Sequence, residues 1–128
     1  MSTSANFFST PRTASGLVST ANPNRDGSGT VPTIMTAAAS GTRIDDIEIQ
    51  AFGATSAGVF RLYLNDGAGN RMVREILVTA ITPSTTVAAF NARVTDLAWI
   101  LQNASWSLRA STEVANNFNI FVTRAGDA

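Results

Sequence analysis

The chain has 128 residues, and its nine arginines balance nine acidic residues to give a formal net charge of zero, with no lysine, histidine or cysteine. The missing histidine and cysteine exclude the usual hydrolase triads, thiolate nucleophiles, disulfides and sulfur-ligated metals. Balanced charge gives no electrostatic footprint for nucleic acid, and no window reaches the roughly 18 apolar residues of a membrane span. We therefore expect partners other than nucleic acid or membrane.

Residues 1–42 are dominated by Ser, Thr, Ala, Asn, Gly and Pro, with only scattered large apolar side chains. Such a segment cannot easily offset its own ordering entropy, so we predict an extended N-terminal arm over residues 1–42 and a folded domain over residues 43–128. Phe7 and Phe8 are the expected anchors of this arm on a partner. Two alternatives stay open: the two rings pack on the domain's own sheet, or residues 17–21 or 33–36 add a further strand.

From Arg43 onward, short runs rich in β-branched and aromatic residues alternate with turn residues. This spacing is typical of a β-sandwich or barrel, and it predicts six or seven strands that each keep one apolar face. Phe60 and Leu62 share such a face, as do Phe118, Ile120 and Val122. We therefore predict an all-β fold, an antiparallel β-sandwich of jelly-roll or Greek-key type.

The stretch "FRLYLNDGAGNRMVREILV", residues 60–78, is typical of a hairpin with apolar side chains on both faces. Alternation places Val59 and Tyr63 of its first strand outward, with Val73 and Leu77 of its second. Met72, Ile76 and Val78 then fall on the other face with Arg74. Contiguous exposed apolar patches usually mark interfaces, so we predict that these four outward residues form one, in a homo-oligomer for which a trimer is favoured. The alternative is that another segment of the same chain covers this face.

Candidate chemistry is sparse along the chain. The turns "NPNRDGSG" and "NDGAGN" contain one aspartate each, which favours ordinary turn hydrogen bonding over a calcium site. Asp45 and Asp46 are adjacent, and on a regular strand they would point to opposite faces, so they would not act together on one substrate. Because no phosphate loop, dinucleotide fingerprint or nucleophile elbow occurs, we assign no catalytic, cofactor-binding or metal-binding residue and expect a protein that is not an enzyme.

The segments "LVSTANPNRDGSGT", "RIDDIEIQAFGATSAGVFRLYLNDG", "REILVTAITPS" and "WSLRASTE", in this order, resemble a group of small β-rich virion structural proteins of tailed bacteriophages and prophages. The resemblance implies a head decoration or cement protein that binds the major capsid protein or other virion proteins. It implies location in the virion, after assembly in the host cytoplasm.

Two other functions stay open at this stage. The first is a structural protein of the tail or of the head–tail junction. The second is a receptor-binding carbohydrate module, since β-sandwiches often bind sugars on exposed aromatic rings. Tyr63, Trp99 and Trp106 are the candidate platforms for a sugar in that case.

Overall fold

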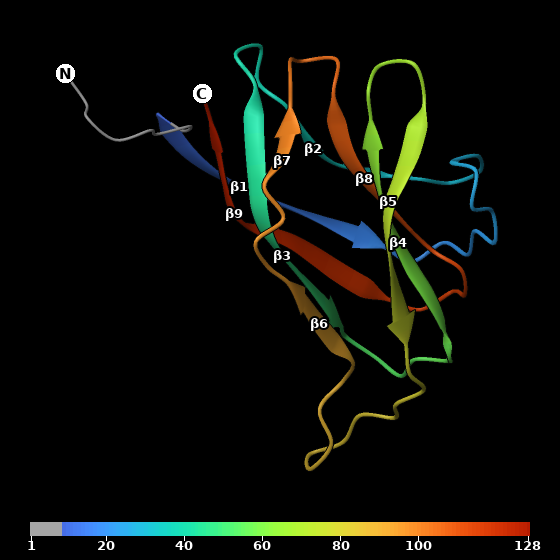
Figure 1. The fold of residues 1–128 in the computed structure, drawn as a ribbon. Coiled ribbons are helices and arrows are strands. Elements are labelled where there is room, and N and C mark those ends of the chain that lie inside the picture. The colour runs from blue at the N-terminus through green and yellow to red at the C-terminus, as the bar shows by residue number, and fades with distance from the viewer. Residues whose placement is uncertain (1–8) are drawn as a thin grey trace.

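The computed structural model describes residues 9–128, and these residues form nine β-strands and no helix (Figure 1). It follows that none of the described residues belongs to a helix that could cross a membrane. The strands are β1 (Thr10–Val18), β2 (Thr33–Thr36), β3 (Thr42–Ala51), β4 (Gly58–Asn65), β5 (Asn70–Val78), β6 (Asn91–Val94), β7 (Trp99–Leu101), β8 (Ser107–Thr112) and β9 (Phe118–Asp127).

The strands pair in a nested order, from the ends of the described chain toward its middle. β1 pairs with β9, β2 with β8, β3 with both β6 and β7, and β4 with β5, all antiparallel. Two further pairings, β3 with β9 and β4 with β8, join these pairs into two sheets. The β9 sheet has the order β1-β9-β3-β6 with β7 also on β3, and the β4 sheet has the order β2-β8-β4-β5.

The two sheets bury a shared core between their inner faces. Phe118 of β9 meets Phe60 of β4 edge to face, with ring centroids 5.1 Å apart, and it meets Phe90 in the same geometry at 6.1 Å. Such T-shaped pairs align the positive edge of one ring with the negative face of another. Ile120 and Leu62 are also fully buried in this cluster. The predicted all-β chain with antiparallel sheets is therefore confirmed, as is the inward face of these strands.

The structure differs from the predicted arm over part of residues 1–42. β1 lies at the edge of the β9 sheet and β2 at the edge of the β4 sheet, so residues 10–18 and 33–36 are strands. The alternative of a further strand at residues 33–36 is confirmed. The physical reason is that neighbouring strands supply the backbone hydrogen bonds, while a small residue permits close packing: a Cβ at Gly16 would lie 2.7 Å from Ile34 Cδ1. Phe7 and Phe8 lie outside the described residues.

The β1–β2 loop, residues 19–32, is held by side-chain amides. Asn22 Nδ2 donates to the carbonyl oxygens of Ser28 and Thr30, and Asn70 Nδ2 donates to the carbonyl oxygen of Gly27. Gly27 has a φ of 87°, and a Cβ there would lie 2.7 Å from Asn70 Cβ, so this position requires glycine. The two acidic turns seen in the sequence therefore lie against each other.

The aspartate of each turn caps its own backbone. Asp26 accepts from the amide and hydroxyl of Ser28, and Asp66 accepts from the amides of Ala68 and Gly69. These hydrogen bonds favour the charged carboxylate, so the pKa of both residues lies below the ordinary value of 3.8. Their folded-state pKa is below the unfolded one, so the stability they contribute is present above pH 3.8 and is lost as the pH falls through the lower folded value.

We expect carboxyl carbon NMR titration to give midpoints below 3.8 for both aspartates. Replacing Ser28 with alanine removes the hydroxyl donor, so the midpoint of Asp26 should move up toward 3.8 while Asp66 serves as the internal reference. A midpoint of Asp26 that does not move in Ser28→Ala would show that the hydroxyl is not the main cause.

Candidate interaction surface

The structure separates the four residues that we predicted on the outer face of the hairpin. Val73 and Leu77 on β5 are exposed, by 39% and 78%. Val59 on β4 is half-buried, next to Leu77 in the register of the two strands. Tyr63 is fully buried, which removes it from the exposed surface that the alternation suggested.

Tyr63 is buried because the β1–β2 loop covers the outer face of β4. Its hydroxyl donates to the carbonyl oxygen of Asn24 at 3.2 Å, and two residues earlier on the strand Arg61 Nη1 donates to the carbonyl oxygen of Asn22 at 3.3 Å. The alternative that the same chain covers this face is therefore confirmed for β4. On β5 the loop contacts Asn70 and Glu75, and it leaves Leu77 exposed.

Arg61 is fully buried, and two carboxylates neutralise it. Its Nε lies 3.0 Å from Glu75 Oε2, and its Nη2 lies 3.2 Å from Glu113 Oε2. Arg25 of the β1–β2 loop adds a third contact, 3.4 Å from Glu75 Oε2. This network attaches the loop to β4, β5 and the start of the β8–β9 connection.

β5 contains a β-bulge at Val73 that changes which side chains share a face. Arg74 stands opposite Leu62 and Met72 opposite Tyr63, so Val73 is the extra residue. Opposite residues share a face, so Met72 lies with Tyr63 on the outer side, and the predicted grouping of Met72 with Ile76 and Val78 is wrong. We call the exposed apolar residues of this strand, Met72, Val73 and Leu77, the β5 strip.

The charged residues of β5 differ in how they are paired. Glu75 is held by Arg61 and Arg25, as described above. Arg71 Nε lies 3.5 Å from Asp66 Oδ2. Arg74 is exposed, and its side chain makes no ion pair or hydrogen bond with any other residue in the described part of the chain. The edge strand therefore presents an apolar strip beside an arginine with no ionic partner.

The β9 sheet has a second irregular region, at the adjacent acids Asp45 and Asp46. Both neighbours, Ile44 and Ile47, are fully buried in the core, so the two acids between them both face outward at a bulge. The prediction that Asp45 and Asp46 point to opposite faces is therefore wrong. β9 is irregular at the same level, where Thr123 and Arg124 lie between the buried Val122 and Ala125.

These two acids hold the connection between β6 and β7. Asp46 Oδ1 accepts from the amide of Asp96 at 3.1 Å, and the carbonyl oxygen of Asp45 accepts from the amide of Leu97 at 2.9 Å. Asp96 has a φ of 56°, a strained conformation that such contacts stabilise. Asp45 Oδ1 is bound by Arg43 Nε at 2.8 Å. The Asp46 carboxylate thus has a structural use in the turn, whereas the Asp45 carboxylate pairs with Arg43.

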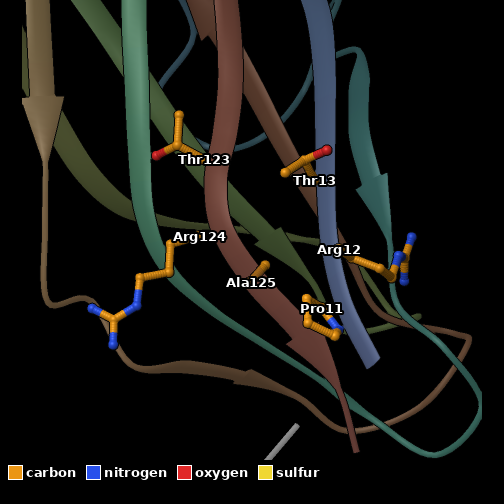
Figure 2. A pocket seen from close by; sticks show the side chains of 6 residues that line it. All are labelled: Pro11, Arg12, Thr13, Thr123, Arg124 and Ala125. Carbon is orange, nitrogen blue, oxygen red and sulfur yellow. The ribbon is translucent and has the colours of Figure 1, made fainter. Parts of the chain in front are cut away.

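A shallow pocket of about 280 Å³ lies beside this region, where the ladder between β1 and β9 is interrupted (Figure 2). It is lined by Pro11, Arg12, Thr13, Thr123, Arg124 and Ala125. Arg12 is already engaged, because its guanidinium donates to Asp127 Oδ1 and to the carbonyl oxygen of Thr36. In residues 9–128, no group of three or more potential metal-ligating side chains comes together.

The aromatic residues considered for sugar binding are not open platforms. Tyr63 is fully buried, and Trp99 and Trp106 are partly buried against the core. In comparisons with known proteins, no family model and no curated protein matches this chain. Among the described large apolar side chains, Leu77 of the β5 strip is the most exposed.

Proposed function

We propose that this chain is a non-enzymatic structural protein that works by binding other proteins through the β5 strip. One observation carries the proposal: Leu77 is 78% exposed on an edge strand, and Met72 and Val73 are exposed on the same strand. A free strand edge with apolar side chains is a template for pairing with another chain, and soluble proteins usually cover or charge such edges. Leu77 is therefore the residue whose burial against a partner would contribute the most favourable free energy.

The sequence resemblance supplies the biological setting of this proposal. In that setting the chain is a bacteriophage virion component. It is a capsid decoration or cement protein that binds the major capsid protein and is located in the virion. The proposal includes a β-sandwich of jelly-roll type. The nested pairing of β1 with β9, β2 with β8, β3 with β6 and β7, and β4 with β5 supports it, because a jelly roll is a long hairpin rolled into two sheets.

The two alternative functions differ in how well the structure supports them. A place in the tail or at the head–tail junction would use the same strip, so the geometry favours neither site in the virion. Carbohydrate binding is less well supported, because the three aromatic residues considered for it are buried or packed on the core. Mass spectrometry of purified heads and purified tails distinguishes a location in the head from a location in the tail.

Replacing Val73 and Leu77 together with aspartate tests the proposal. We expect the variant to keep the circular dichroism spectrum of the folded protein, because both side chains are exposed, and to lose co-sedimentation with particles that lack the protein. We also propose that copies of the chain associate through the same strip as a trimer. Light scattering should then show a trimer for the unchanged protein and a monomer for the variant.

The matched control is Leu17→Asp with Phe121→Asp, two similarly exposed apolar residues on the outer face of the β9 sheet. This control variant should bind particles like the unchanged protein. Retained binding by the β5 variant together with lost binding by the control would place the interface on the β9 sheet and contradict the proposal.

A further inference from the structure

We propose that β5 binds an extended segment of another protein as an added strand of the β4 sheet, and that this segment has apolar residues followed by two carboxylates at positions i and i+2. The inference rests on the proposed function of the β5 strip and adds the mode of binding and the chemistry of the partner. Three observations carry it. The backbone edge of β5 is unpaired among the described residues, Arg71 and Arg74 share a face, and pairing β5 with its own copy centred on a charged residue would set like charges opposite each other.

The backbone of β5 is paired on one side only. Its nine residues, about 30 Å of extended chain, pair with β4, and in the described part of the chain no strand lies on the other side. In an antiparallel ladder, alternate residues turn their N–H and C=O groups to the free side, where a partner strand can bind them. The edges at β2, β6 and β7 are only three or four residues long, and β1 contains Pro11. β5 is therefore the longest proline-free edge among the described strands.

The bulge brings two arginines to one face of this edge. Arg71 stands opposite Leu64 and Arg74 opposite Leu62, and these leucines are two residues apart on β4. Arg71 and Arg74 therefore share a face although they are three residues apart in sequence. Arg71 has only its 3.5 Å contact with Asp66, and Arg74 has no ionic partner among residues 9–128. A partner strand with carboxylates two residues apart would meet both.

The same charges disfavour antiparallel edge-to-edge pairing of β5 with β5 of a second copy. A two-fold axis through an antiparallel pair places one residue opposite its own copy. Centred on Arg74 or on Glu75, such a pair sets like charges against each other, which destabilises a sheet. Centred on Ile76, it overlaps only five residues and leaves Arg74 opposite Val78. Centred on Val73, it would have to pair the bulged residue with its own copy. An acidic segment of a different protein fits the edge better.

The remaining positions of β5 define the rest of the partner. Ile76, Leu77 and Val78 form the end of the strand away from the arginines, so apolar residues are expected opposite them. In an antiparallel partner these residues come first, and the two acids follow. A blocked heptapeptide of sequence Val-Val-Ile-Thr-Glu-Val-Glu has this pattern and serves as the probe.

The experiment titrates the full chain with this peptide and with three controls, using fluorescence anisotropy. One control replaces both glutamates with glutamine, one replaces them with lysine, and one carries N-methyl groups on alternate backbone nitrogens. We expect the glutamine peptide to bind about tenfold more weakly than the parent, because two opposite-charge pairs are lost. The N-methylated peptide should not bind, because the added groups block the ladder hydrogen bonds. Arg71→Glu with Arg74→Glu should reverse the preference between the glutamate and lysine peptides.

Each outcome decides a distinct part of the inference. Equal binding of the parent and N-methylated peptides overturns strand addition, and equal binding of the glutamate and lysine peptides overturns the charge requirement. Absence of binding by every peptide also overturns the inference, and light scattering that then shows a dimer abolished by Val73→Asp with Leu77→Asp would assign the edge to a second copy. Loss of particle binding in that double variant, with no peptide binding, would retain the proposed function and reject this mode. If the arginine variant fails to fold, the peptide comparison on the unchanged chain still decides.

Discussion

Replacement of Arg61 with alanine is expected to lower the free energy of unfolding by about 3 kcal/mol. The side chain is fully buried, and its guanidinium contacts Glu75, Glu113 and the carbonyl oxygen of Asn22. Its loss would leave Glu113 without a cation in the described part of the chain and Glu75 with only Arg25, and it would remove a hydrogen bond that holds the β1–β2 loop on β4. Urea denaturation followed by circular dichroism measures the change, through the midpoint and slope of the transition.

Two further variants make this result specific. Arg61→Lys keeps the charge but replaces the planar guanidinium with a single ammonium, so we expect a stability between that of the unchanged protein and that of the alanine variant. Arg71→Ala removes an exposed pair with Asp66 and should change stability by no more than about 0.5 kcal/mol. Equal effects of Arg61→Ala and Arg71→Ala would show that the buried network does not hold the loop.

Replacement of Phe118 with alanine should lower the free energy of unfolding by about 4 kcal/mol, the largest effect of a single substitution that we expect in this protein. Phe118 is fully buried and makes edge-to-face contacts with Phe60 and Phe90, so its removal opens a cavity where the two sheets meet. Thermal and urea unfolding both measure the loss.

The neighbouring Phe121 on the same strand is the control for this prediction. It is 48% exposed on the outer face, so Phe121→Ala should change stability by only about 0.5 kcal/mol. Phe118→Leu keeps most of the volume and should cost about 1 kcal/mol. If Phe121→Ala proved as costly as Phe118→Ala, the assignment of inner and outer faces on β9 would be wrong.

The regular strands were predictable because side chains alternate with period two. Phe60 and Leu62 on β4, and Ile120 and Val122 on β9, point inward as that period requires. The bulge in β3 also had a signal in the sequence. In "RIDDIEIQA" the spacing of apolar residues changes from three, between Ile44 and Ile47, to two thereafter. A break of this kind in an alternating pattern indicates an extra residue in the strand.

Other features were not predictable because they depend on pairing partners far away in the sequence. β1 contains few large apolar residues, and it is a strand because β9, more than 100 residues later, supplies its hydrogen bonds. Tyr63 alternates outward as expected, but the β1–β2 loop covers it, and no local pattern states where a polar loop will lie. The sequence therefore did not indicate that Tyr63 would be buried, whereas the exposure of Val73 and Leu77 agreed with the alternation.

The position of β9 in its sheet has a consequence for how the protein can be made. β9 follows β1 and β3 in the sequence but lies between them in the sheet, so neither of these strands has its central neighbour until synthesis has passed residue 127. The β9 sheet therefore cannot close until β9 has left the ribosome. Closure has to join the first described strand to the last, and such distant pairings make folding slow, on the scale of milliseconds to seconds. Deleting residues 118–127 would therefore remove the middle of a sheet and not its margin.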